Sequence, residues 1–335
     1  MIPNRYHFIW FGRTFPLTHA LALRSLAATS APEAVVLHAS DDLRGQPEFD
    51  ALVADLPTLS VEAIDLASLL DEPGVPDPGI LRAIANQLFA RREWVALTDI
   101  LRHLVLYRDG GVYLDMDTLT VRDMRPLLSE PGFCGRERIL VDAAAYRRAS
   151  PWRYFRTAPL DVARWICSRT DGGIRRFARI ADLYRAAINN AVLALPARHA
   201  LAREALQAVP QRISALERRR PALGPDLLQD LIDRKRRSDV TVFGPAHFYP
   251  LGPEMAIHLF RLRANAAAVD HALREAISAE TYVVHWYNNN LKKVPRPLDR
   301  ASIERLADRQ IFSRLARPFL GRLPVGAVAD QRDVA

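Results

Sequence analysis

In the first part of the chain, short continuous runs of apolar residues alternate with longer segments in which apolar residues recur every three or four positions. Residues 5–11, 35–39 and 60–66 have the length and composition of buried strands. Residues 17–28 and 80–92 repeat apolar side chains at helical spacing, and each follows a loop that contains proline or glycine. Repeated strand–helix units of this size predict an α/β, Rossmann-like fold with a mainly parallel central sheet.

Residues 98–117 join a further helix to a strand and carry most of the candidate chemistry. Apolar residues recur at helical spacing over residues 100–107, and the pair Gly110–Gly111 predicts that the helix ends there. Beyond the glycines, apolar and polar residues alternate, which predicts a strand through Asp117 with one buried face. Asp115 and Asp117 would share the other face, with backbones roughly 6.6 Å apart, close enough to interact with one divalent cation.

Asp99 and Arg102 lie three residues apart on the preceding helix, so they share a helical face. A carboxylate beside a guanidinium suits a sugar hydroxyl beside a phosphate, although such a pair is also a common solvated ion pair. An isolated Asp-X-Asp is likewise common in turns. Here the aspartates follow an apolar strand, at the edge where an open α/β sheet forms its ligand crevice, and this position favours a binding site.

The pattern is weaker in the rest of the chain. Residues 175–209 have apolar residues at helical spacing on both sides of Pro196, which predicts two helices. Residues 299–323 are basic and partly apolar, and predict either an amphipathic helix lying on a membrane or a helix packed against the domain. The remaining expected elements are strands at 132–141, 240–245 and 281–285, an aromatic loop at 146–155 and a long helix ending near Arg274.

The chain has 335 residues, a formal net charge of +8 and a sequence pI of about 9.8. The length suits one large α/β domain or two small domains, and no linker divides the chain. The charge favours anionic partners such as nucleotide diphosphates or phospholipid headgroups. Nucleic acid is disfavoured, because the basic clusters at 218–220 and 234–237 lack interleaved aromatic residues and have aspartates between them. We interpret these clusters as solvated surface or as a membrane-surface patch.

Cys134 and Cys167 are too few and too far apart for a disulfide framework or a zinc site, and they fit a reducing compartment. The N-terminal residues lack the pattern of a secretory signal, and the chain has no stretch of about 18 uncharged apolar residues. We therefore expect a soluble cytoplasmic protein. Peripheral contact with the inner face of the membrane through the basic C-terminal region is an open alternative.

The stretch from Thr98 to Asp117 resembles the core motif of the DXD-containing sugar-binding family, glycosyltransferase family 32, and is similar to the catalytic domain of the clostridial glucosylating toxins. Family members carry an Asp, an Arg three residues later, a Gly-Gly pair, a Tyr and then Asp-X-Asp, at the spacing seen here. The resemblance implies a GT-A fold over residues 1–298, with a nucleotide-binding half at about 1–121 and an acceptor-binding or closing half at about 122–298. Residues 299–335 would form a basic C-terminal helix and tail.

The resemblance also implies catalytic roles for four residues. Asp99 would contact the donor sugar, and Arg102 would contact both the sugar and the diphosphate. Asp115 and Asp117 would contact the ribose, the diphosphate and a divalent metal ion. Tyr113 would line the site of the nucleotide-sugar donor.

Five further residues are candidates, Asp41 from its place after a buried strand and the other four by the same resemblance, and each has a structural alternative. Trp10 would stack on uracil or belong to the core, and Asp41 would contact the nucleoside or lie in a surface turn. Asn190 would contact the donor or lie on a helix surface. His285 would complete the metal shell or pack at the end of a strand. Asn289 would lie close to the diphosphate or form part of a turn.

These assignments predict a metal-dependent, retaining glycosyltransferase. By the resemblance it would transfer a sugar from a nucleotide diphosphate sugar, a UDP-sugar in the first instance, to a saccharide or lipid-linked acceptor. Surface polysaccharide or glycolipid synthesis would be its role. Mn²⁺ or Mg²⁺ held by the aspartates would neutralise charge that develops on the leaving diphosphate.

Two other functions stay open at the level of the sequence. Residues 112–119 also match the nucleophile strand of a haloacid dehalogenase-like Mg²⁺-dependent phosphatase, with Asp115 as nucleophile and Asp117 as acid/base. That class needs a later Lys and a Gly-Asp-X-X-X-Asp motif, for which the stretch from Gly224 to Asp230 is a poor substitute. The other alternative is a catalytically silent sugar-nucleotide binder.

Overall fold

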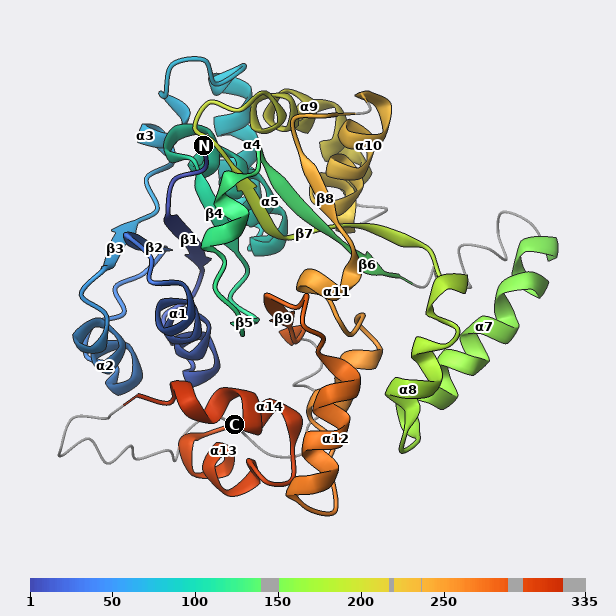
Figure 1. The fold of residues 1–335 in the computed structure, drawn as a ribbon. Helices are drawn as coiled ribbons and strands as arrows, with labels where there is room; N and C mark the ends of the chain where they lie inside the picture. Colours follow the sequence, from blue (N-terminus) through green and yellow to red (C-terminus); the bar gives the residue numbers. More distant parts are fainter. Residues whose placement is uncertain (140–150, 217–219, 236, 289–297, 322–335) are drawn as a thin grey trace.

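The computed structural model describes residues 1–139, 151–216, 220–235, 237–288 and 298–321. The strands in this part of the chain are β1 (Arg5–Trp10), β2 (Ala34–Ala39), β3 (Leu59–Ala63), β4 (Gly111–Leu114), β5 (Thr118–Thr120), β6 (Phe133–Arg138), β7 (Ala186–Leu195), β8 (Thr241–Phe243) and β9 (Val283–His285). Seven of these described strands form one sheet in the order β3-β2-β1-β4-β7-β6-β8, and β5 pairs with β9 in a small second sheet (Figure 1).

Most neighbouring strands of the large sheet are parallel. β1 is parallel to β2 and β4, β2 is parallel to β3, and β6 is parallel to β8. β7 runs antiparallel to both of its neighbours, β4 and β6. The predicted α/β class with a mainly parallel central sheet is therefore confirmed. The carboxyl ends of β1, β2 and β4 meet at one edge of the sheet, where ligands bind in open α/β folds.

Helices cover both faces of the large sheet, so residues 6–9 of β1 and all of β4 are buried (Figure 1). The helices in the described residues are α1 (Leu17–Ser30), α2 (Pro47–Asp55), α3 (Leu66–Leu70), α4 (Pro78–Ala90), α5 (Trp94–Asp109), α7 (Pro151–Arg169), α8 (Gly173–Ala178), α9 (Ala200–Leu216), α10 (Pro225–Lys235), α11 (Pro245–Phe248), α12 (Ala266–Ala276), α13 (Arg300–Leu306) and α14 (Ile311–Ala316). One core contains α3, α4, α5, α9 and α10, a second contains α1, α2 and α11, and a third joins α12, α13 and α14 to β9.

β7 takes the place of the first of the two helices expected at 175–209, so that prediction is wrong. Its sequence is rich in alanine and other apolar residues, a composition that buried helices and buried strands share. Because β7 lies between β4 and β6 and is buried on both faces, it has no alternation that would identify a strand. Pro196 follows the end of the strand, and α9 begins at Ala200.

Two other expected elements also differ. The aromatic loop expected at 146–155 is helical from Pro151, the first residue of α7, and residues 146–150 lie outside the described part of the chain. The long helix expected to end near Arg274 is divided into α11, the short 3-10 helix η4 (Met255–Leu259) and α12. Prolines at 250 and 253 interrupt the backbone hydrogen bonds that a continuous helix would need.

The C-terminal helices pack against the rest of the molecule, which is one of the two arrangements expected for residues 299–323. Ile303 and Phe312 are buried in the same core as Trp286. Arg300 forms an ion pair with Glu48 of α2, with Nη2 and Oε2 2.6 Å apart. Among the residues that the structure describes, no helix has the length and apolar character needed to cross a membrane.

Candidate active site

Two glycines form the turn between α5 and β4. Gly110 and Gly111 have φ angles of 66° and 102°, in the left-handed region that favours glycine. A Cβ atom on Gly111 would come within 2.4 Å of the backbone oxygen of Arg5, so the close approach of β4 to β1 requires glycine there. The predicted end of the helix is confirmed. The turn directs the end of β4 toward the carboxyl edge of the sheet.

The strand predicted to reach Asp117 ends at Leu114. Residues 115–117 form a turn, in which Thr118 Oγ1 donates to the backbone oxygen of Asp115 at 2.8 Å. Tyr113, expected on an open face, is 1% exposed because helices cover both faces of this central strand. The turn still brings the side chains of Asp115 and Asp117 together, as the shared strand face would have done.

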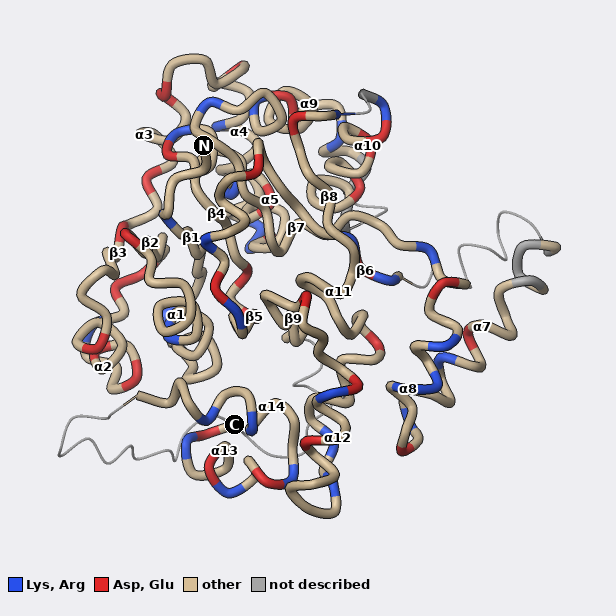
Figure 2. Tube along the Cα trace, in the orientation of Figure 1, with Lys and Arg blue, Asp and Glu red and all other residues tan. Residues whose placement is uncertain are grey.

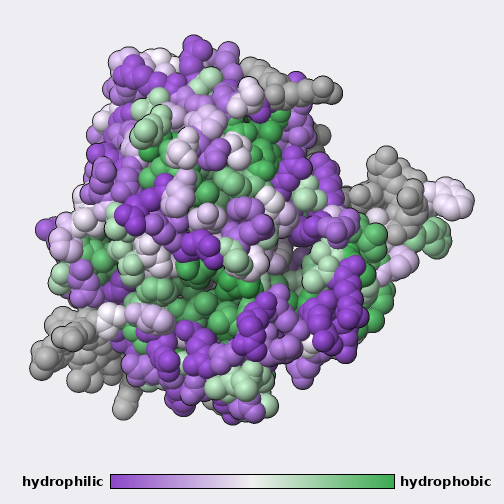
Figure 3. Space-filling view, in the orientation of Figure 1, coloured by the Kyte–Doolittle hydropathy of each residue, from purple (hydrophilic) through white to green (hydrophobic). Residues whose placement is uncertain are grey.

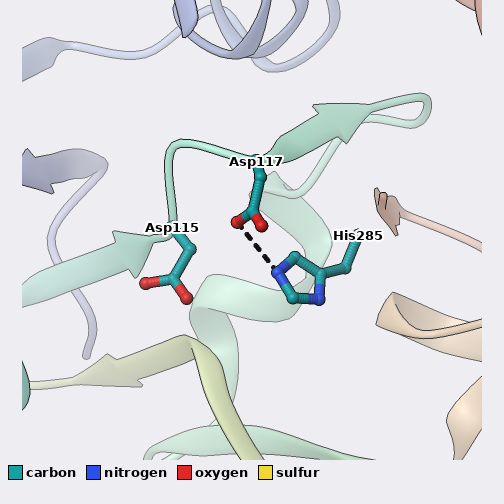
Figure 4. A group of neighbouring side chains, drawn as sticks. All are labelled: Asp115, Asp117 and His285. Atoms are coloured by element: carbon teal, nitrogen blue, oxygen red, sulfur yellow. Dashed lines mark hydrogen bonds and ion pairs between the residues drawn. The ribbon is translucent and has the colours of Figure 1, made fainter. Parts of the chain in front are cut away.

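Asp115, Asp117 and His285 form a cluster that can hold a metal ion (Figure 4). One ligand atom of each residue lies within 4.8 Å of the others. The antiparallel register of β5 and β9 pairs Thr118 with His285 and so places the imidazole beside Asp117. The two carboxylates suit Mn²⁺ or Mg²⁺, whose octahedral ligands lie roughly 3 to 4 Å apart, and the imidazole suits Mn²⁺ better than Mg²⁺, which prefers oxygen. The residues therefore fit the implied metal.

Asp117 and His285 form a close ion pair. The Nε2 atom of His285 is 2.9 Å from one carboxylate oxygen of Asp117, and the backbone N–H of Asn288 donates to the other at 2.7 Å. Burial opposes the charge on Asp117, but the attraction of His285 and these hydrogen bonds outweigh it and lower the pKa of Asp117. Burial likewise opposes the charge on His285, and Asp117 raises the pKa of His285. A metal ion at this site would therefore compete with a proton for His285.

Asp99, Arg102 and Asn190 form a second, buried cluster beside the first. Asp99 Oδ1 is 3.1 Å from Arg102 Nη2 and accepts a hydrogen bond from Asn190 Nδ2 at 2.7 Å. Arg102 lies over the Tyr113 ring, 4.4 Å from its centroid, and its Nη1 is 3.4 Å from Asp115 Oδ1. Tyr113 donates its hydroxyl proton to the same oxygen of Asp115 at 2.6 Å. Asp115 therefore links the two clusters.

The second cluster combines a weakly acidic carboxyl with a permanent positive charge. Burial raises the pKa of Asp99 to about 6, although Arg102 and Asn190 favour the charged form. Burial opposes the charge on Arg102, but Tyr113 and the two aspartates outweigh it and raise the pKa of Arg102. The cluster can therefore accept hydrogen bonds from hydroxyl groups at Asp99 and attract phosphate oxygens at Arg102.

The outer candidates lie at the carboxyl ends of β1 and β2. The ring of Trp10 is partly buried and lies 4.3 Å, between centroids, from that of His19. Asp41 and Trp94 line a cavity of about 660 Å³. The ligand contacts expected of Trp10 and Asp41 stay predictions, and Asn289 lies outside the described residues.

The structure adds Glu137 and Tyr287 to the surroundings of the metal-binding cluster, and sequence reasoning missed both. Glu137 Oε2 accepts a hydrogen bond from Tyr287 at 2.6 Å, and the ring of Tyr287 lies 4.0 Å, between centroids, from that of His285. Burial raises the pKa of Glu137, although its hydrogen bond with Tyr287 opposes the shift. The sequence signal was slight, a single acidic residue within the strand expected at 132–141.

The geometry disfavours the phosphatase alternative. Gly224 packs against the second cluster, where a Cβ atom would come within 2.7 Å of the Asp99 carboxylate. Asp230 of α10, which would have to serve as the last Asp of the phosphatase motif, forms an ion pair with Arg212 of α9 instead. The stretch from Gly224 to Asp230 therefore places no carboxylate in the described metal-binding group of Asp115, where a phosphatase metal site would require one.

Comparison with protein families agrees with the motif. Residues 20–134 match the family model described as a glycosyltransferase sugar-binding region containing a DXD motif. The matched region includes Asp99, Arg102, Asp115 and Asp117, and it stops before Asn190 and His285. The match confirms the resemblance seen in the sequence and the glycosyltransferase class. No curated protein matches the chain by sequence.

Several solved glycosyltransferase structures are similar to this one. The PaToxG glycosyltransferase matches with 15% identity, a TM-score of 0.47, and coverage of 95% of this chain and 87% of that chain. The UDP-bound glycosyltransferase domain from the YGT toxin matches with 11% identity, a TM-score of 0.42, and coverage of 96% and 99%. Galactosyltransferase LgtC, in complex with donor and acceptor sugar analogs, matches with 14% identity, a TM-score of 0.41, and coverage of 96% and 98%.

Proposed function

We propose that this glycosyltransferase is metal-dependent and retaining, and that it transfers a sugar from a UDP-sugar to a saccharide or lipid-linked acceptor. The observation that carries the proposal is the position of Asp115 between the two clusters. Its Oδ1 atom is 3.4 Å from Arg102, and its carboxylate also belongs to the metal-binding group with Asp117 and His285. A diphosphate bound at Asp115 would therefore have a metal ion on one side and a guanidinium on the other.

Each cluster has a distinct task in the proposed transfer. Asp115, Asp117 and His285 would hold Mn²⁺ or Mg²⁺, which neutralises charge that develops on the leaving diphosphate. Arg102 binds the diphosphate as a charged donor held in place by Asp99 and Tyr113. Its fixed charge stabilises the leaving group without reorganisation during the reaction.

The remaining contacts with the donor are proposed for residues that lie near the same edge of the sheet. Asp99 and Asn190 would contact hydroxyl groups of the transferred sugar, because they lie beside Arg102 and Asp99 keeps a second carboxylate oxygen that can accept a hydrogen bond. Trp10 stacks on the uracil ring and Asp41 contacts the nucleoside, at the ends of β1 and β2. Retention of anomeric configuration rests on the resemblance to retaining families, and a role in surface polysaccharide or glycolipid synthesis rests on the short relatives of that family.

The test is hydrolysis of nucleotide sugars with and without Mn²⁺, across UDP-glucose, UDP-galactose, their N-acetyl forms and GDP-mannose. Asp117→Asn is expected to reduce metal-dependent turnover by about 100-fold or more, because an amide has no charge to hold a hard cation. His285→Ala is expected to raise the Mn²⁺ concentration needed for half-maximal turnover.

The matched control is Asp308→Asn, which removes an exposed carboxylate that pairs with Arg314. It should turn over donor as the wild type does. Undiminished turnover in Asp117→Asn would exclude the proposed site. A phosphoaspartate trapped on Asp115 would instead establish the phosphatase reaction.

A further inference from the structure

Helices α7 and α8 form an arm, residues 151–178, that projects from the side of the molecule (Figure 1). One face of α7 packs on α8 and on η4. Cys167 is buried in that contact, and its backbone oxygen is 2.8 Å from a ring nitrogen of His258. Arg164 on the same face pairs with Glu254. These contacts fix the orientation of α7 and leave its opposite face toward solvent.

The outer face of α7 is a continuous apolar stripe. Its positions 152, 155, 159, 162 and 166 follow helical spacing of three and four residues and span about 21 Å along the helix. The exposed fractions are 80% for Trp152, 70% for Phe155, 56% for Val162, 56% for Trp165 and 43% for Ile166. Figure 3 shows hydrophobic side chains gathered over this arm. Monomeric soluble proteins rarely expose an apolar face of this extent.

The arm is also strongly basic. Residues 151–185 contain eight arginines and three aspartates. Arg169 stacks on Trp165, with its guanidinium 4.4 Å from the ring centroid, at the C-terminal end of the stripe. Arg175, Arg176 and Arg179 are exposed on and beside α8 (Figure 2). Apolar side chains bounded by tryptophan and arginine are the composition of helices that lie in a membrane interface.

We propose that the apolar stripe of α7 lies in the headgroup region of an anionic lipid bilayer, with the helix parallel to the membrane surface. The stripe would enter the boundary between headgroups and acyl chains, and the arginines around it would contact lipid phosphates. Helices α13 and α14 offer no comparable stripe, because their apolar residues Ile303, Ile311 and Phe312 are buried in the molecule. The inference concerns a surface away from the donor site and does not depend on the proposed donor or metal.

Charge favours lipid over a second copy of the chain. Two arms brought together through their stripes would place two strongly basic surfaces against each other, and like charges in contact oppose association. An anionic membrane surface attracts the same arginines, each contributing to binding within a Debye length. Binding of the stripe to a protein partner or to a second copy of the chain is the competing explanation, and the experiment must distinguish it from binding to lipid.

The experiment is co-sedimentation of the full chain with vesicles of phosphatidylcholine and phosphatidylglycerol, and with vesicles of phosphatidylcholine alone. The wild type is expected to bind the anionic vesicles, and to bind them less as salt is raised. Trp152→Asp/Val162→Asp removes two apolar side chains and adds two negative charges. It should reduce vesicle partitioning by about tenfold or more.

The matched control is Ile80→Asp/Val95→Asp, which makes the same charge change on another part of the surface. The exposed fractions of the two side chains are 51% for Ile80 and 72% for Val95. It should bind vesicles as the wild type does, and both double variants should keep the thermal transition and the donor hydrolysis of the wild type. The proposal is overturned if the wild type binds neither vesicle, or if the α7 variant binds as well as the control. It is also overturned if light scattering shows a wild-type dimer that the α7 variant disrupts while no vesicle binding occurs.

Discussion

His103 is a buried imidazole in α5, and in the described part of the chain neither of its ring nitrogens has a hydrogen-bond partner. Burial lowers the pKa of His103 to about 3, and the charge of Arg102 acts in the same direction. The folded state therefore needs the neutral ring, whereas the unfolded chain takes up a proton near the usual pKa of about 6.5. As pH falls through that value, His103 should lower the free energy of unfolding by about 1.4 kcal/mol for each pH unit, until about pH 3.

Replacing His103 with leucine, an apolar side chain of similar size, should remove this sensitivity. We expect His103→Leu to raise the free energy of unfolding at pH 7 by about 1 kcal/mol, because two buried nitrogens without partners are removed. It should also flatten the acid side of the stability profile. Urea unfolding at pH 7 and pH 5 measures both effects.

His271→Leu is the control, since it makes the same substitution at an exposed residue of α12 and should not remove the acid sensitivity that His103 causes. A loss of stability in His103→Leu at pH 7 would show that the buried imidazole makes a favourable polar contact, and would contradict the prediction.

Three elements meet at the second cluster, and Gly224 is the point of closest contact. Asp99 lies in α5, Asn190 lies in β7, and Gly224 is the residue that precedes α10. A Cβ atom on Gly224 would lie 2.6 Å from Asn190 Nδ2 and 2.7 Å from both Asp99 oxygens. These atoms are held by the hydrogen bond between Asp99 and Asn190, so they cannot yield as a flexible side-chain end would.

Gly224→Ala should therefore displace the Asp99–Asn190 pair or the start of α10. We expect kcat/KM for the nucleotide sugar to fall by about tenfold, since small displacements of positioning groups have effects of this size. Steady-state donor hydrolysis measures it. Gly79→Ala is the control, because a Cβ atom on Gly79 has no described atom within 4 Å. Equal kcat/KM for the two variants would remove the second cluster from the donor site.

The local part of the site could be predicted from sequence, because it depends on spacing within one element. Asp99 and Arg102 share a helical face, and the glycine pair ends α5, as expected. The pairing of Asp117 with His285 joins residues 168 positions apart and depends on the register of β5 and β9, which no local pattern specifies. Only the family resemblance suggested His285. β7 was misread because a strand buried on both faces has the composition of a buried helix.

At the scale of the whole molecule, the C-terminal helices complete the core beside α1. Arg24 of α1 is buried, and its guanidinium donates to the backbone oxygen of Leu320 at 3.1 Å and pairs with Asp55 at 2.9 Å. Ile311 and Phe312 belong to the same core as Leu21. We propose that residues 299–321 are part of the glycosyltransferase domain.

Deletion of residues 299–335 should prevent stable folding, because it removes a partner of buried Arg24 and exposes the apolar side of α1. The measurements are the soluble yield and the thermal transition. A chain that ends at residue 321 is the control, because it keeps α13, α14 and Leu320, and it should keep a cooperative transition. A cooperative transition at an unchanged temperature in the shorter chain would show that the C-terminal helices form a separate unit.

The place of β7 in the sheet has a consequence for the time at which the site forms during synthesis. β1, β2, β3 and β4 leave the ribosome in order, but the free edge of β4 has no partner until residue 195 has emerged. At 5–20 residues per second, the edge stays open for roughly 4 to 16 s after β4 is made. Through that interval the open edge is a template for wrong strand pairing. The three residues of the proposed metal site can come together only later still, once residue 285 has emerged.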